Sequence, residues 1–172
     1  PARAPFSTWL DNLHDGSVHS IAFANTLAIC CHRSYTVNGN PVAIPTEFPP
    51  VSKHAGYTSD APVARNLGWQ SGKATRVISV IMDSLEACLP FLEPGKKVTV
   101  LNFGDAYKPG GEIMSGLTTQ EEALCRRSNL FASIRQARDT VPDTYPLQPD
   151  KIPFAALYSE GVTVFKNIDY EV

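Results

Sequence analysis

Two short motifs in the middle of the chain suit acid–base chemistry beside a bound anion. Gly110 and Gly111 are adjacent, and Gln120, Glu121 and Glu122 stand nine to eleven positions after Gly111. Adjacent glycines let the backbone approach a ligand closely and turn N–H groups toward it, as in loops that hold a diphosphate. Adjacent residues of a helix point about 100° apart, so one carboxylate can face a cleft while its neighbour bonds elsewhere.

The paired carboxylates are poor ligands for a phosphate group, because like charges repel. A carboxylate beside a diphosphate is better suited to act as an acid or base on a bond one sugar away. Cleavage of a glycosidic bond to ribose needs a carboxylic acid that protonates the leaving oxygen, and anionic surroundings that stabilise an oxocarbenium-like centre. The pattern therefore favours a site that cleaves such a bond.

Both motifs also have a purely structural interpretation. Thr118 stands three positions before Glu121 and Thr119 three before Glu122, and each pair matches a capping box, which begins many helices that have no catalytic role. The glycine pair after Pro109 matches a simple turn. On the residues alone, capping and catalysis both stay open.

The motifs lie between a predicted strand and a predicted helix. Residues 97–103 predict a buried strand, and Asn102 and Asp105 lie at its end, where such residues form turns or contact ligands. The helix is predicted over residues 119–136. Its buried face is expected to hold Leu124, Phe131 and Ile134, and its solvated face Arg126, Arg127 and Gln136.

The N-terminal part predicts a helix and a hairpin. Residues 17–32 place apolar side chains at helical spacing, and Asp15 or Ser17 would begin the helix. Asn38 and Gly39 lie between two short apolar segments, which is typical of a two-residue hairpin turn.

The remaining segments predict a loop, a mixed segment and a last strand. The prolines of residues 45–62 favour a long surface loop, and residues 75–89 pass from a β-branched run into a helix that Pro90 ends. Residues 154–166 predict the last strand. Its aromatic side chains expected in the core are Tyr158 and Phe165. Alternating strands and helices predict an α/β fold with a ligand site at the carboxyl end of a strand.

The composition predicts a single globular domain over residues 1–172. Hydrophobic residues make up 43% of the 172-residue chain, and its formal net charge is −2. Because a nucleic-acid binder normally carries a basic excess, we expect no direct nucleic-acid binding. No apolar run reaches the length of a membrane span, so we expect no membrane partner. The four cysteines fit reduced thiols in an intracellular protein, which we expect to be cytoplasmic or, in a eukaryote, nuclear.

Residues 101–131 resemble the core of the bacterial-type poly(ADP-ribose) glycohydrolases. The signature of these macrodomain-fold enzymes is a glycine triplet followed, after a short spacer, by Gln-Glu-Glu, which stand here as Gln120, Glu121 and Glu122. A looser resemblance covers residues 18–168. It implies a macrodomain-like, three-layer α/β/α fold with a mixed central sheet, and hydrolysis of the ribose–ribose O-glycosidic bonds of poly(ADP-ribose) with release of ADP-ribose.

The same resemblance implies a role for each residue of the motifs. Glu122 would be the catalytic acid, and Glu121 would bond a ribose hydroxyl of the scissile sugar. The substrate-binding residues would be Gln120, which supports the catalytic loop, Gly110 and Gly111 at the diphosphate, and Asn102 and Asp105 near the distal ribose. No metal and no cofactor are implied, the partners are poly(ADP-ribose) or ADP-ribosylated proteins, and we expect a monomer.

Two features depart from the family pattern. Glu112 replaces the third glycine, which adds a side chain and a negative charge to the loop. Family members continue with at least one further strand, so we expect a C-terminally incomplete fold at Val172. Two alternative functions stay open, namely binding of ADP-ribose without hydrolysis, and removal of a single ADP-ribose from a protein side chain.

Overall fold

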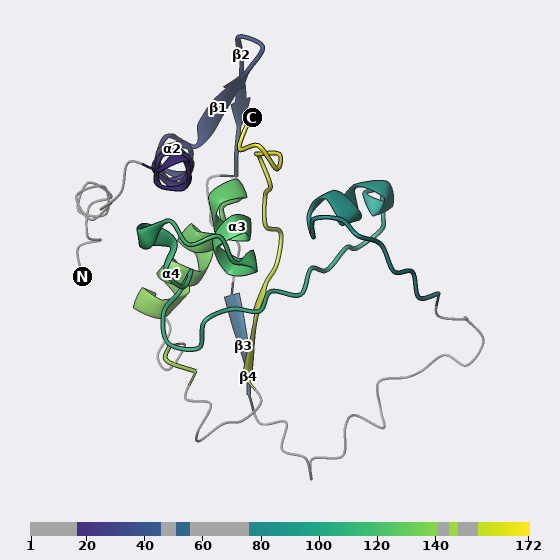
Figure 1. The fold of residues 1–172 in the computed structure, drawn as a ribbon, viewed down its shortest axis with the longest axis vertical. Coiled ribbons are helices and arrows are strands. Elements are labelled where there is room, and N and C mark those ends of the chain that lie inside the picture. Colours follow the sequence, from purple (N-terminus) through teal and green to yellow (C-terminus); the bar gives the residue numbers. More distant parts are fainter. Residues whose placement is uncertain (1–16, 46–50, 56–75, 141–144, 148–154) are drawn as a thin grey trace.

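The structure, a computed structural model, describes residues 17–45, 51–55, 76–140, 145–147 and 155–172. The described α-helices pack together near the centre of the molecule and are α2 (Val18–His32), α3 (Gln120–Arg127) and α4 (Leu130–Thr140). A hairpin of β1 (Ser34–Val37) and β2 (Asn40–Ala43) extends from one end, and β3 (Val51–Ala55) pairs with β4 (Ala155–Ser159) at the other (Figure 1). The short 3-10 helices are η1 (Glu86–Phe91) and η2 (Ile113–Ser115). A mixed α/β chain is what the sequence predicts.

The N-terminal helix and the hairpin form as their local sequences predict. The hydroxyl of Ser17 accepts a hydrogen bond from the N–H of Ser20 at 3.3 Å and caps α2. Asn38 and Gly39 occupy the turn with φ of 50° and 80°, the left-handed values that a two-residue hairpin turn requires. β1 and β2 are antiparallel. Both predictions are confirmed.

The helix predicted over residues 119–136 is two helices, because the chain is extended at Ser128. The Ser128 hydroxyl donates to the carbonyl of Leu124 at 2.7 Å and accepts the N–H of Leu130 at 3.2 Å, which replaces helical backbone bonds. Ser128 also bridges to Val164, and the side chain of Asn129 accepts the N–H of Thr163 at 2.9 Å. The C-terminal segment therefore docks into the break between α3 and α4.

The core lies between helices α2, α3 and α4 and the 3-10 helix η2. One apolar cluster contains Phe23 and Phe131, whose rings meet edge-on with centroids 5.0 Å apart. A second cluster joins α2 and α4 to Phe165, whose predicted place in the core is confirmed. Tyr158 is 43% exposed, so its predicted place in the core is wrong. The four cysteines are free, and Cys30 and Cys125 are buried.

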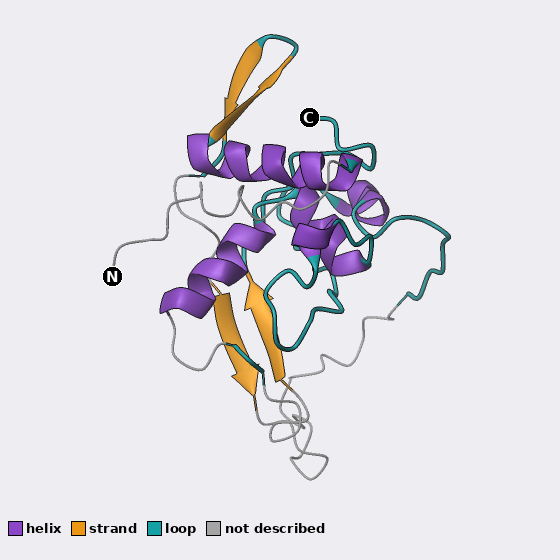
Figure 2. Ribbon diagram, turned by 60° about the vertical axis from the view of Figure 1, so that its left-hand side comes forward, coloured by secondary structure: helices purple, strands orange, loops and turns teal. Residues whose placement is uncertain are grey.

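Residues 97–103 form no strand, which corrects the sequence prediction. Both sheets of the described residues are antiparallel pairs, β1–β2 and β3–β4, and neither includes this segment (Figure 2). Phe103 is 77% exposed, and the β-branched run of residues 76–81 is exposed as well. Alternating apolar residues favour an extended backbone, but a strand also needs a second backbone as its partner.

Three other segments differ in part from their predictions. Residues 51–55, predicted as loop, form β3 opposite β4. The predicted helix of residues 75–89 is the 3-10 helix η1, which contains Pro90 instead of ending before it. The last strand is confined to Ala155–Ser159. Asp15, residues 46–50 and 56–62, residue 75 and residue 154 lie outside the described residues. Among the described helices, none has the length and apolarity needed to cross a membrane.

Candidate active site

Helix α3 places two adjacent carboxylates inside the protein. Glu121 and Glu122 occupy its first turn, and each is only 2% exposed. The helix begins after Thr119, whose side chain makes no capping bond to the helix backbone. The capping-box interpretation therefore fails for both pairs of residues, and the two carboxylates bond to the loop of residues 105–112 and to the Thr119 hydroxyl.

The Glu121 carboxylate holds the two ends of the loop before the glycine pair. Its Oε2 accepts the N–H of Asp105 at 2.7 Å, and its Oε1 accepts the N–H of Gly110 at 3.2 Å. Burial raises the pKa of Glu121 above its ordinary value, and the charge of Glu122 adds to this effect. Hydrogen bonds from the two N–H groups and from the Asn102 side chain oppose the increase.

The Glu122 carboxylate bonds on the other side of the loop. Its Oε1 accepts the N–H of Glu112 at 3.0 Å, and its Oε2 accepts the hydroxyl of Thr119. The N–H of Gly111 donates to the carbonyl of Lys108 at 3.0 Å. The N–H groups of residues 110–112 are thus bonded within the protein, two of them to the acids.

Gly110 and Gly111 are required where they stand because side chains occupy the space beside them. A Cβ on Gly111 would lie 2.4 Å from Oε1 of Glu122, and a Cβ on Gly110 would lie 2.5 Å from the ring of Phe131. Gly111 also has a φ of 57°, which L-residues rarely adopt. The glycine pair therefore lets the loop close directly over the two acids.

Exchanging each acid for its amide should separate the two positions by stability. Both oxygens of Glu121 accept backbone N–H groups, so the NH₂ group that E121Q introduces would face a backbone donor. This should lower the free energy of unfolding by about 1–3 kcal/mol. In E122Q the amide oxygen keeps the N–H of Glu112, and its NH₂ donates to the Thr119 hydroxyl. Urea unfolding should show a marked loss for E121Q and little change for E122Q. Equal losses would contradict this geometry.

Gln120 fixes the extended segment that precedes the loop. Its Oε1 accepts the N–H of Phe103 at 3.0 Å, and its Nε2 donates to the carbonyl of Leu101 at 3.0 Å. The same Nε2 lies 3.0 Å from Oγ of Ser84. The amide thus bonds to the segment as the backbone of a neighbouring strand would, and it anchors the segment to α3.

Asn102 and Asp105 have different environments. Oδ1 of Asp105 accepts the N–H groups of Tyr107 and Lys108 at 2.7 and 2.8 Å, so this side chain forms a turn. Oδ1 of Asn102 is buried, and within the described part of the chain it has no hydrogen-bond partner. An unpaired buried acceptor is costly, so Asn102 is suited to accept a ligand hydroxyl.

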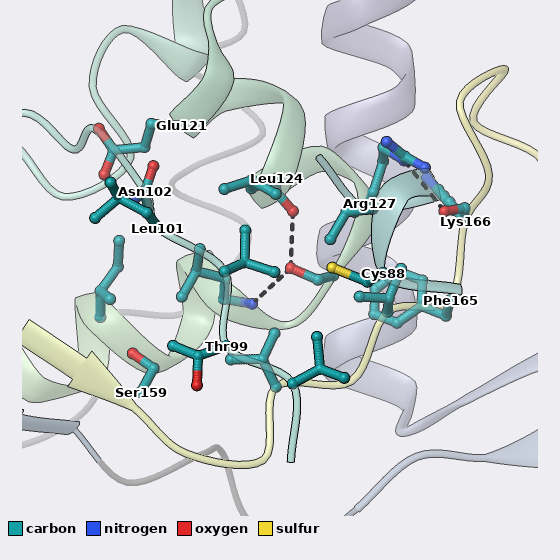
Figure 3. A pocket seen from close by; sticks show the side chains of 18 of the residues that line it. Cys88, Thr99, Leu101, Asn102, Glu121, Leu124, Arg127, Ser159, Phe165 and Lys166 are labelled. Atoms are coloured by element: carbon teal, nitrogen blue, oxygen red, sulfur yellow. Dashed lines mark hydrogen bonds between the residues drawn. The ribbon is translucent and has the colours of Figure 1, made fainter. Parts of the chain in front are cut away.

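A cavity of about 1160 Å³ opens beside Glu121. Asn102 and Glu121 lie together at one end of it, and Cys88, Arg127 and Phe165 lie at the other (Figure 3). Glu122 is not among its described lining residues. The cavity therefore presents a carboxylate and an unpaired amide oxygen to a ligand, on otherwise mainly apolar walls.

Sequence reasoning placed Arg126 and Arg127 on a solvated face, and this is wrong because both are buried. Arg127 bonds to Asp83 at 2.6 Å and to Glu86 at 2.9 Å. Burial alone would raise the pKa of Asp83, but hydrogen bonds, among them one from Arg127, outweigh it and lower this pKa below its ordinary value. Nη1 of Arg126 donates to the carbonyl of Leu117 at 2.7 Å. Arg127 therefore fixes the carboxyl end of the helix that carries the acids, and Arg126 bonds back to the segment just before its amino end.

Tyr145 is a cavity residue that sequence reasoning missed. It lines the same cavity as Glu121, and burial raises the pKa of its phenol, with Glu121 adding to the effect. The N–H of Leu147 donates to the carbonyl of Ala106 at 2.7 Å and ties this short segment to the loop. The proline-bearing stretch around Tyr145 gave no signal beyond that of a polar loop.

Comparisons with known proteins found similar solved structures and a matching family. The crystal structure of poly(ADP-ribose) glycohydrolase (PARG) from Thermomonospora curvata matches with a TM-score of 0.66 and 26% identity, over 87% of this chain and 57% of that chain. Its complex with the inhibitor ADP-HPD matches with the same TM-score and identity over 55% of that chain, and a point mutant with 0.65 and 24%. The chain thus spans little more than half the length of these solved chains.

The match confirms the predicted macrodomain-like α/β fold class. No match was found among curated proteins. The sequence model of the microbial-type PARG catalytic domain matches residues 24–167, which is most of the chain and includes the glycine pair and both acids. The chain therefore belongs to the family of microbial-type PARG catalytic domains.

Proposed function

We propose that this domain hydrolyses the ribose–ribose O-glycosidic bonds of poly(ADP-ribose) and releases ADP-ribose, with Glu122 as the acid that protonates the leaving oxygen. The observation that carries the proposal is the pair of buried carboxylates, each held by a backbone N–H of one loop. Water then adds to the anomeric carbon and restores the proton of Glu122. The family to which the chain belongs supports this assignment.

In this mechanism Glu121 and Asn102 hold the scissile sugar. An ionised carboxylate accepts about four hydrogen bonds, and Glu121 uses three of them, for the N–H groups of Asp105 and Gly110 and for the Asn102 side chain. The remaining capacity suits a ribose hydroxyl, and the unpaired Oδ1 of Asn102 supplies a second acceptor beside it. A sugar that presents two hydroxyl groups satisfies both side chains.

The test is to incubate the protein with long-chain poly(ADP-ribose) and with a mono-ADP-ribosylated protein, and to measure released ADP-ribose by chromatography. We expect the polymer to shorten, and we expect free ADP-ribose to raise the melting temperature. A melting shift with intact polymer would identify a binding module instead. Release from the mono-ADP-ribosylated protein alone would identify a side-chain hydrolase.

The Lys108–Glu112 ion pair at the edge of the loop should tune the affinity for ADP-ribose. Both side chains are at least half exposed, and they form an ion pair with each other. In E112Q a negative charge disappears and Lys108 is free to attract the diphosphate, so we expect the affinity to rise about two- to fivefold. K108Q leaves Glu112 unpaired and should lower the affinity by a similar factor. Titration calorimetry at low salt measures both, and identical affinities would contradict a role for the pair.

A further inference from the structure

The two oxygens of the Glu122 carboxylate have different neighbours. Oε1 accepts the N–H of Glu112, and a Cβ on Gly111 would lie 2.4 Å from this oxygen. Oε2 accepts the hydroxyl of Thr119, a residue that is itself exposed. Oε1 is therefore enclosed by the glycine loop, whereas Oε2 meets a side chain at the protein surface.

This difference decides which oxygen can carry a proton. A backbone N–H only donates, so a proton on Oε1 would face the N–H of Glu112 donor to donor. A hydroxyl can donate or accept, so the Thr119 hydroxyl can turn and accept a proton carried by Oε2. We propose that Thr119 is a positioning residue that makes Oε2 of Glu122 the oxygen bearing the transferable proton, an inference that rests on the proposed function.

The proton-transfer step balances with these groups alone. The O–H bond of Oε2 breaks as its proton passes to the oxygen that joins two riboses, and the bond from that oxygen to the anomeric carbon breaks. The Thr119 hydroxyl then donates to Oε2, which has become negative. Water adds to the anomeric carbon and returns one proton to Glu122. One water is consumed, and each of the two riboses ends with a hydroxyl group.

Helix capping does not account for the contact between the Thr119 hydroxyl and Glu122. Thr119 makes no side-chain bond to the helix backbone, so its hydroxyl serves the carboxylate. Glu121 and Cys125 on the same helix interact electrostatically with Glu122, and the backbone N–H of Glu112 on the loop donates to it. The replacement of Thr119 leaves all of them in place.

The experiment compares T119V, which loses the hydroxyl at equal size, with T119S, which keeps it. For T119V we expect kcat to fall about tenfold with KM within about twofold. T119S should match the wild type in kcat and KM. A role in capping alone would lower the melting temperature of T119V and leave kcat unchanged, and that result would overturn the proposal.

A second measurement does not depend on catalysis. The affinity of T119V for ADP-ribose, measured by calorimetry, should stay within about twofold of that of the wild type and of T119S. A loss of affinity that matches the loss of kcat would overturn the proposal. A wild-type protein that binds ADP-ribose but never cleaves polymer would instead refute the proposed function.

Discussion

E122Q is expected to lower the rate of poly(ADP-ribose) cleavage about 1000-fold while the affinity for ADP-ribose stays within about tenfold. The amide has no proton to give at neutral pH, so the leaving oxygen would depart as an alkoxide. The amide nevertheless satisfies both neighbours of the carboxylate, since its oxygen accepts from Glu112 and its NH₂ donates to Thr119. The loss of activity would therefore arise in the proton-transfer step and not in folding or binding.

The rate is measured as ADP-ribose released under single-turnover conditions, and the affinity by calorimetry. E112Q is the matched control, because it neutralises an exposed acid of the same loop ten positions earlier in the chain. It should retain activity near that of the wild type. An E122Q protein that cleaves polymer at a rate near that of the wild type would refute the assignment of Glu122 as the acid.

G111A is expected to lower activity by at least about 100-fold and stability by at least about 2 kcal/mol. The new methyl group would lie 2.4 Å from Oε1 of Glu122, so either the loop or the carboxylate must move. A φ of 57° adds backbone strain for an L-residue. Movement of the carboxylate would displace the proton donor from the leaving oxygen.

The G39A variant separates the effect of backbone strain from the effect of a steric clash with a neighbouring side chain. Gly39 has a φ of 80°, but nothing lies within 4 Å of a Cβ built on it. We expect this variant to lose about 1–2 kcal/mol of stability and to keep its activity. Urea unfolding and the polymer-cleavage assay measure the two effects. If G111A lost no more activity than G39A, the close contact between the loop and Glu122 would have no catalytic importance.

The parts of the fold that local chemistry determines could be predicted from the sequence. The Ser17 cap and the Asn38-Gly39 turn need only neighbouring residues, and both are confirmed. The break at Ser128 could not be predicted, because it depends on Val164, 36 positions away in the chain. The burial of Arg127 likewise depends on Asp83 and on the carbonyl of Lys166. Such partners leave no local pattern.

The candidate site was predicted in its members but not in its geometry. The spacing of the glycine pair and the acids brought them together in the sequence, and the structure brings them into contact. The sequence predicted loop N–H groups that face a diphosphate, whereas those of Gly110 and Glu112 bond to Glu121 and Glu122. A motif records which residue types are needed, but the direction of each hydrogen bond depends on the packed backbone. The roles of these residues in catalysis stay predictions.

The docking of the C-terminal segment into the break after α3 has a consequence for how the acids become ordered. A helix of eight residues is too short to persist in water by itself. At its carboxyl end Arg127 donates to the carbonyl of Lys166, and just after it Asn129 accepts the N–H of Thr163. At its amino end Glu121 accepts the N–H of Gly110. The position of the two acids therefore depends on three segments, of which the C-terminal one is remote in sequence from the other two, and local opening of any one of them would loosen the other two.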